Sequence, residues 1–119
     1  MNIVKRILKA NQGRGPERLA MKFLALRSGP FPFLRGTCHL FYERLASSGF
    51  GASAPPVWRC GDLHRENFGS CKGDNRRVYF DINDFDEAAP APATWELVRL
   101  AANMHAAYDA GQFQVAAGE

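Results

Sequence analysis

The sequence predicts an α+β fold in which helices surround a small two-stranded β element. Residues 1–56 carry apolar side chains at helical spacing, interrupted by Gly and Pro. Two short segments that read as strands follow, at 57–60 and 77–82. A further apolar pattern with helical period begins near residue 94. This order of helices, two strands and a helix indicates the α+β class.

Two amphipathic helices are expected at the start of the chain. The first ends near Gly13 and rests on four apolar residues at helical spacing: Ile3, Val4, Ile7 and Leu8. The second begins near Pro16, because proline suits the first helical position. It stops at Ser28-Gly29-Pro30, and its apolar stripe is formed by Leu19, Phe23 and Leu26.

An extended segment should separate these helices from a third one. Phe31-Pro32-Phe33 is expected to be extended, because proline disfavours the helical conformation of the residue before it. The third helix is predicted over residues 37–46, with one apolar face formed by Leu34, Cys38, Phe41 and Leu45. Residues 47–56 are rich in Gly, Ser, Ala and Pro and are predicted to be a loop.

The two predicted strands are Val57–Cys60 and Arg77–Ile82, and we expect them to lie side by side. Lys72–Asn75 between them has the composition of a turn. Pro90–Pro92 is predicted to be a linker before the last helix. Thr94 is the expected N-cap of that helix. Its buried face would be formed by Trp95, Val98, Ala101, Ala102 and His105, and Trp58 is expected in the core as well.

Length and composition are those of one small soluble domain. The chain has 119 residues, of which 46% are hydrophobic and 23% charged. No apolar run approaches the roughly 20 residues that cross a bilayer, and the N-terminus lacks the pattern of a signal peptide. We therefore expect a cytoplasmic protein without membrane contact. The three cysteines are odd in number and lack C-x-x-C spacing, which argues against disulfides and a zinc knuckle.

The net charge of +3 hides an asymmetry between the halves of the chain. Residues 1–59 carry ten Lys or Arg and two acids, whereas residues 60–119 carry five and ten. The basic residues alternate with apolar ones at helical spacing, which favours solvated helix faces over nucleic-acid binding. The acids of the second half are more informative, because they cluster in a short stretch.

The candidate metal-binding and proton-accepting residues lie in two acidic segments, and each segment follows or ends a predicted strand. They are residues 60–69, which include Asp62 and Asn67, and residues 80–87. If the strands pair, Asp62, Asn67 and one of Asp81, Asp84 and Asp86 could converge. Carboxylate and amide oxygens suit Mg²⁺, which keeps other positions for water and phosphate. A second carboxylate nearby could accept a proton from an attacking hydroxyl.

Asp62 followed by Asn67 resembles the D-x-x-x-x-N of a kinase catalytic loop. G-D-L-H-x-x-N resembles the form used by aminoglycoside and choline phosphotransferases, and N-D-F-D-E-A resembles their metal-binding D-F-G. The resemblance implies part of the C-terminal lobe of a protein-kinase-like fold, with ATP and Mg²⁺ or Mn²⁺ as cofactors. It implies Asp62 as catalytic base, with Asn67, Asp84 and Asp86 at the metal. Asp84 is preferred over Asp81 because roughly a dozen residues separate it from Glu96, where those enzymes often have Asp.

A closer resemblance is to a bacterial family, domain of unknown function 2252, over residues 20–108. It rests on PFxFLRG at Pro30–Gly36, on GDLHxxNFG, and on NDFDEA followed by a Trp-acid-Leu-x-Arg-Leu-Ala helix. Arg35, His64 and Arg65 are the candidates for contacting the nucleotide, although His64 could instead order its loop and Arg35 could pair with an acid. The acceptor would be a hydroxyl of a small molecule or protein.

Two other functions fit the sequence less well. A metallophosphoesterase also uses Gly-Asp-Leu-His, but it needs further downstream ligands, and after His64 the only histidine is His105. A calcium loop starting at Asp81 fails, because Asp86 and Pro92 stand where Gly and Glu are required.

The chain also lacks parts that a kinase-like enzyme requires. Gly13-Arg14-Gly15 is too weak for the Gly-rich phosphate cover, and Lys22 lies on a helical pattern rather than on a strand. We therefore expect one partial domain, with a helical segment over residues 1–35 and the two loops within 36–112. It should be weakly active or inactive alone, or serve as a non-catalytic nucleotide-binding, metal-binding or interaction module. A homodimer is a further expectation.

Overall fold

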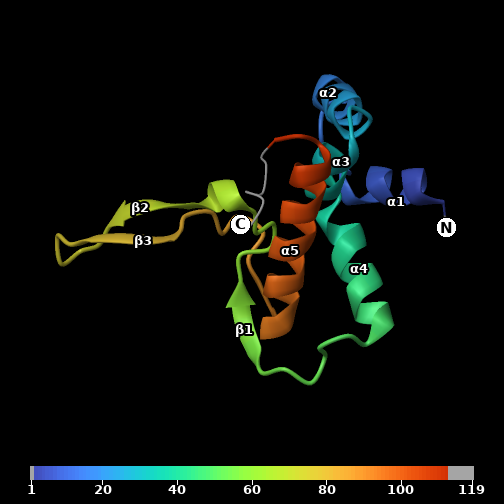
Figure 1. The fold of residues 1–119 in the computed structure, drawn as a ribbon. Helices are drawn as coiled ribbons and strands as arrows, with labels where there is room; N and C mark the ends of the chain where they lie inside the picture. The colour runs from blue at the N-terminus through green and yellow to red at the C-terminus, as the bar shows by residue number, and fades with distance from the viewer. Residues whose placement is uncertain (1, 113–119) are drawn as a thin grey trace, which may run out of the picture. The chain divides into compact units, whose positions relative to one another are not determined.

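A computed structural model of the chain describes residues 2–112. Five α-helices, one 3₁₀ helix and two small antiparallel sheets occur in this part, which confirms the α+β class (Figure 1). In chain order the elements are α1 (Ile3–Ala10), α2 (Pro16–Leu26), α3 (Pro30–Gly36), α4 (Cys38–Ser48), β1 (Pro56–Arg59), η1 (Arg65–Asn67), β2 (Phe68–Lys72), β3 (Val78–Ile82), β4 (Ala89–Pro92) and α5 (Ala93–Asp109). Within residues 2–112, no helix has both the length and the apolar character needed to span a membrane.

The described chain divides into two compact units. The helical unit comprises residues 2–48 with 106–112, and the loop unit comprises Gly49–His105. The helical unit buries a set of mostly apolar side chains from its helices: Ile7, Leu26, Phe31, Cys38, Tyr42, Leu45 and Ala107. Buried apolar residues of the loop unit are Cys60, Leu63 and Ala91. The candidate catalytic residues lie in the loop unit.

The expectation of an extended segment at Phe31–Phe33 is wrong, because these residues form the middle of α3. Gly29 precedes this helix, and Pro30 and Pro32 both lie within its first turn. The first backbone N–H groups of a helix have no intrahelical acceptor, so a proline there sacrifices no helical hydrogen bond. The third predicted helix is confirmed as α4, and Cys38 and Leu45 are buried as expected.

The pairing expected for the two predicted strands is also wrong. Strand β1 pairs with β4 in antiparallel register, with Pro56 opposite Pro92 and Arg59 opposite Ala89. Strand β3 pairs with β2 instead, and the predicted turn at residues 72–75 lies in their hairpin (Figure 1). The two strands that the sequence suggested therefore belong to different two-stranded sheets.

Two of the four strands were missed because their composition is poor in β-formers. Strand β2 has the sequence FGSCK, and β4 has the sequence APAP in the segment expected to be a linker. Proline is tolerated in edge strands, and both strands of a two-stranded sheet are edges. Trp58 of β1 was expected in the core, but 74% of it is exposed.

The last helix buries a different face from the one predicted. Ala101 and His105 are exposed, whereas Arg99, Asn103 and Ala107 are buried at successive i, i+4 positions. Thr94 is not the N-cap, because α5 already includes Ala93 and the Thr94 hydroxyl donates to the Gly51 carbonyl at 2.9 Å. Two of the three buried positions, Arg99 and Asn103, are polar, and their partners are Asp62 and Leu63 in the loop that follows β1.

Candidate functional site

Two loops of the loop unit connect the two small sheets. Residues 60–67 lead from β1 through η1 into β2, and residues 83–88 lead from β3 into β4. The Asn83 backbone N–H donates to the Asn67 carbonyl at 2.8 Å, which extends the β2–β3 pairing into the loops. Gly61 has a φ of +100°, and a Cβ placed there would lie 2.6 Å from the Glu87 carbonyl oxygen. A glycine is therefore needed where the loops approach each other.

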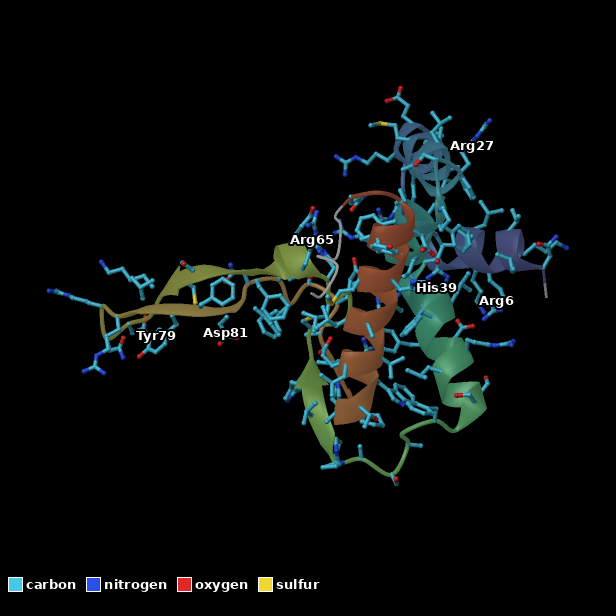
Figure 2. The ribbon with its side chains drawn as sticks, viewed as in Figure 1. Arg6, Arg27, His39, Arg65, Tyr79 and Asp81 are labelled. Atoms are coloured by element: carbon cyan, nitrogen blue, oxygen red, sulfur yellow. The ribbon has the colours of Figure 1, made fainter. Side chains whose placement is uncertain are left out.

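Both loops line one cavity of about 160 Å³. Its walls are formed by Cys60, Asp62, Asn67, Asp84, Asp86 and Glu87. The structure thus brings together Asp62 of the first acidic segment with Asp84 and Asp86 of the second. Asp81 is not in this lining. It lies on β3 opposite Gly69, and its Oδ1 accepts from the Ile82 N–H at 2.7 Å (Figure 2).

Asp84 and Asp86 are both exposed and belong to one tight turn. The Asp86 N–H donates to Asp84 Oδ1 at 3.1 Å, an Asx-type contact that fixes the loop locally. Because both side chains reach the cavity and remain accessible to solvent, their carboxylates can meet a ligand that enters from outside.

Carboxylates surround the buried Cys60 at the base of this loop. Burial raises the pKa of the Cys60 thiol to about 12 from its ordinary value of 9.0, and Glu96, Asp62 and Asp84 raise it further by their negative charge. The thiol donates to Glu96 Oε1 at 3.4 Å. The thiol therefore stays protonated and neutral near pH 7, and the cavity around it favours positive charge.

A polar face of α5 holds the loop that carries Asp62. Glu96 Oε2 accepts from the Cys60 backbone N–H at 2.6 Å. Arg99 is fully buried, and its Nη2 donates to Asp62 Oδ1 at 2.6 Å. One helical turn further, Asn103 Nδ2 donates to the Leu63 carbonyl at 2.8 Å. Three side chains of one helix thus fix three residues of the loop.

The sequence reasoning missed Arg99 and Asn103 as site residues. A signal was present, because Glu96, Arg99 and Asn103 have i, i+3, i+7 spacing in a stretch of helix that is otherwise apolar or small from Ala93 to Met104. An arginine within an apolar pattern is rarely buried unless it is paired, so it indicates a buried acidic partner elsewhere in the chain.

His64 and Asn67 order the same loop from within. The side chain of Asn67 accepts the His64 backbone N–H at 2.7 Å, and the Glu66 N–H donates to His64 Nδ1 at 3.3 Å. Both residues are buried. This arrangement is a capping box around η1. It shows His64 in the loop-ordering role considered above, and it shows Asn67 holding a backbone group.

The donors of the cavity fit a hard cation only in part. Besides Cys60, four carboxylates and one amide line it, and their oxygens are donors of the kind that Mg²⁺ prefers. However, within residues 2–112 no three His, Cys, Asp or Glu side chains form a group that could hold a metal ion. One lone pair of Asn67 Oδ1 is already used by His64, although an amide oxygen can accept twice. A cation here would therefore need further oxygen ligands from water or phosphate.

The two arginines predicted to contact nucleotide lie in different units. Arg35 belongs to α3 of the helical unit, where its guanidinium lies 5.9 Å from the centre of the Phe31 ring. Arg65 belongs to η1, on the exposed side of the loop that carries Asp62 (Figure 2). Neither arginine lines the cavity, so a nucleotide contact stays a prediction for both.

The fold is thus of the α+β class, and the two acidic loops of the loop unit share a cavity lined mainly by oxygen donors. Comparison with protein families assigns the chain to a family described as uncharacterized proteins conserved in bacteria, domain of unknown function 2252, over residues 14–117. The chain belongs to this family. No curated protein and no solved structure matches it.

Proposed function

We propose that the chain carries the catalytic and metal-binding loops of a kinase-like phosphotransferase. The observation that supports this is the shared cavity, which Asp62, Asn67 and Asp84 line from two loops far apart in sequence. These are the residues for which the kinase resemblance implies a base and two metal ligands. The comparisons identify the bacterial family alone, so the chemistry rests on this cavity and on the motifs.

Asp62 is the proton acceptor in this proposal. Its ion pair with Arg99 keeps the carboxylate in place at the wall of the cavity, where it can accept the proton of an attacking hydroxyl. Asp84 and Asp86, from the other loop, line the same cavity. These two carboxylates and Asn67 would hold Mg²⁺, which would supply positive charge to offset that of a bound phosphate.

Activity of this chain alone should be very low. The elements described before β1 are helices α1–α4, so within residues 2–55 no strand supplies the lysine that pairs with ATP phosphates in kinases. Nucleotide would be held mainly through metal-bridged phosphates. Since positioning supplies much of phosphoryl-transfer catalysis, weak binding and very slow transfer are expected.

A non-catalytic nucleotide-binding or metal-binding module is the second candidate. It is favoured by the contacts that Asp62 and Asn67 already make, with Arg99 at 2.6 Å and with the His64 N–H at 2.7 Å. Both contacts stabilise the loop without any ligand. In this case the cavity would bind a cation or phosphate, and Asp62 would not exchange a proton with substrate.

Paramagnetic broadening by Mn²⁺ tests the cation site directly. We expect broadening of backbone NMR signals around Asp62, Asn67 and Asp84, with loss of this pattern in Asp84→Asn. Asp81→Asn is the matched control. It removes the same charge only three residues before Asp84, but the Asp81 side chain does not line the cavity. Equal effects of the two variants, or broadening spread over all surface acids, would refute the site.

Turnover then separates the two candidates. Mg-ATP is titrated by calorimetry into the unmodified chain and into Asp62→Ala, with phosphate release followed in parallel. Binding without turnover in either protein favours the module. Slow turnover that Asp62→Ala abolishes favours the phosphotransferase, and fast turnover would show that the expected weakness of the isolated chain is wrong.

A further inference from the structure

The β2–β3 hairpin of the loop unit presents large apolar side chains to solvent. Val78 is 71% exposed and Phe80 is 74% exposed, and the Phe80 ring stacks on Phe68 of β2 with 6.3 Å between the ring centres. Side chains of a strand alternate between its two faces, so these three residues share one face of the hairpin with Ile82. Figure 1 shows the hairpin extending away from β1 of the same unit. A two-stranded ribbon gains stability from further strands, so this hairpin is suited to pairing.

The free edge of β3 carries backbone groups that can bond to a further strand. Backbone hydrogen bonds at both ends of the β2–β3 ladder join odd-numbered residues: Asn67 with Asn83, and Gly73 with Arg77. Because hydrogen-bonded pairs alternate along an antiparallel ladder, Val78, Phe80 and Ile82 direct their N–H and C=O groups away from β2. The Ile82 N–H already donates to Asp81 Oδ1 at 2.7 Å. The Val78 and Phe80 N–H groups therefore face a possible partner strand.

The sequence of β3 is complementary to itself in antiparallel orientation. Phe80 is the central residue of this five-residue strand. A two-fold axis beside Phe80 would place Val78 of each copy opposite Ile82 of the partner subunit. Apolar residues then meet at every position whose backbone groups point outward. The Val78 and Phe80 N–H groups would donate to the carbonyls of Ile82 and Phe80 of the partner subunit. Moving the axis along the strand would leave residues at one end of β3 unpaired.

Charges at the two ends of the hairpin favour the same pairing. The hairpin tip, residues 73–77, holds Arg76, Arg77 and one acid, whereas the loop at the base, residues 83–87, holds three acids and no basic residue. All of these charged residues are exposed, and neither guanidinium makes an ion pair within residues 2–112. In the antiparallel pairing centred on Phe80, each basic tip lies beside the acidic loop of the other copy, with Arg76 opposite Asp84 of the partner subunit.

We propose that the free edge of β3 binds the same edge of a second copy of this chain, so that two hairpins form one antiparallel sheet. The match of both register and charge favours a second copy over a strand of a different protein. A five-residue edge is a small interface, below the roughly 1,200 Å² of standard ones, so the dimer dissociates in about the micromolar range. This pairing does not depend on the function proposed for the Asp62 cavity.

Sedimentation equilibrium of the unmodified chain over a range of concentrations measures the association. We expect a reversible dimer that Phe80→Lys abolishes, because two like charges would then face each other beside the axis. Trp58→Lys is the matched control, since Trp58 is equally exposed, at 74%, but lies in β1 of the other sheet. It should dimerise as the unmodified chain does. Circular dichroism shows whether both variants fold.

The salt dependence of the dimer tests the charge match. Arg76→Gln should weaken dimerisation about three- to tenfold at low salt, because the two-fold axis removes two exposed charge pairs at once. Arg14→Gln is the control, since it removes the same charge from the helical unit, and it should leave dimerisation unchanged. Added sodium chloride should weaken the unmodified dimer more than the Arg76→Gln dimer.

Cysteine cross-linking tests the register, in chains that also carry Cys71→Ser to remove the exposed native thiol. Facing Cα atoms of a hydrogen-bonded antiparallel pair lie about 5.5 Å apart, which a disulfide can span. Phe80→Cys should therefore form a disulfide-linked dimer under mild oxidation. Val78→Cys should not, because its two copies would be separated by four residues, or roughly 13 Å, along the strands.

Four outcomes overturn the proposal. The first is a chain that stays monomeric at about 1 mM. The second is loss of the dimer in Trp58→Lys as well as in Phe80→Lys. The third is an equal effect of Arg14→Gln and Arg76→Gln on dimerisation. The fourth is a cross-linking pattern in which Phe80→Cys fails to link or Val78→Cys links as readily.

Discussion

Breaking the ion pair between Arg99 and Asp62 should destabilise the loop unit strongly. Arg99→Met keeps much of the side-chain volume but leaves the Asp62 carboxylate beside a buried apolar group. Removing one partner of a buried pair costs about 3–5 kcal/mol. The Arg99 side chain is 0% exposed but that of Asp62 is 21% exposed, so water offsets part of this loss. We therefore expect about 3 kcal/mol in the free energy of unfolding.

Urea denaturation measures this loss. With a slope of about 1.5 kcal/mol per molar urea, a loss of about 3 kcal/mol lowers the midpoint by roughly 2 M. The informative variant is the double change Arg99→Met with Asp62→Asn. Removing both charges of a buried pair is far less harmful than removing one, so the double variant should regain a large part of the loss.

Additive losses of stability in the two single variants would contradict a coupling between Arg99 and Asp62. If Arg99→Met and Asp62→Asn each destabilise the chain and the double variant shows their sum, the two side chains are not coupled. The 2.6 Å contact would then not be what positions Asp62. A loss of less than about 1 kcal/mol for Arg99→Met would equally contradict it, because that is the range of exposed pairs.

Two further variants test the neighbouring residues of the same loop. In urea denaturation, Gly61→Ala should destabilise the chain by about 2 kcal/mol more than the control Gly13→Ala. Both glycines have positive φ, but of the two only Gly61 has backbone atoms within 3 Å of the added Cβ. Equal losses would contradict a close contact between the loops. The raised pKa of Cys60 means that the folded state holds this proton more tightly than the unfolded state. Its contribution to stability is therefore complete below pH 9 and is lost as pH rises from 9 towards 12. Cys60→Ala should consequently lose less stability at alkaline pH than the unmodified chain. Parallel curves of unfolding free energy against pH for the two proteins would contradict this.

The acidic residues of the site could be predicted because their signal is local. Asp62 and Asn67 lie five residues apart, and Asp84 and Asp86 lie in one turn, so short motifs capture them without any knowledge of the fold. The choice of Asp84 over Asp81 is consistent with the cavity lining, which includes Asp84 alone of the two. Their role as metal ligands stays a prediction.

Strand pairing could not be predicted, because it depends on contacts between distant segments. Val57–Arg59 and residues 78–82 look like the best strands by composition, and the sequence alone favours pairing them. In the structure, β1 pairs with β4 and β3 pairs with β2. Both of these partner segments have a composition that favours strands less. Composition records side-chain preferences, whereas these short ladders form largely through the backbone.

Helix faces were predicted well only where the buried residues are apolar. In α4 the predicted apolar stripe is confirmed at Cys38 and Leu45, whereas Phe41 is half-buried and Tyr42 is buried instead. In α1 only Ile7 is buried, and Ile3, Val4 and Leu8 are exposed. In α5 two of the buried residues, Arg99 and Asn103, are polar. A pattern of apolar residues predicts core positions, but it does not predict a helix face that is buried because its polar side chains bind a loop.

Two of the three motifs that resemble the family, GDLHxxNFG and NDFDEA with the helix after it, form one contact network in the loop unit. The GDLH segment is held by α5 through Glu96, Arg99 and Asn103. The NDFDE segment approaches it at Gly61 and through the hydrogen bond between Asn83 and Asn67. The helix thus fixes the loop of the proposed base by side chains, while the loop of the proposed metal ligands is fixed by backbone contacts. Substitutions in α5 should therefore displace Asp62 first, whereas Asp84 and Asp86, exposed in their own turn, keep their local geometry.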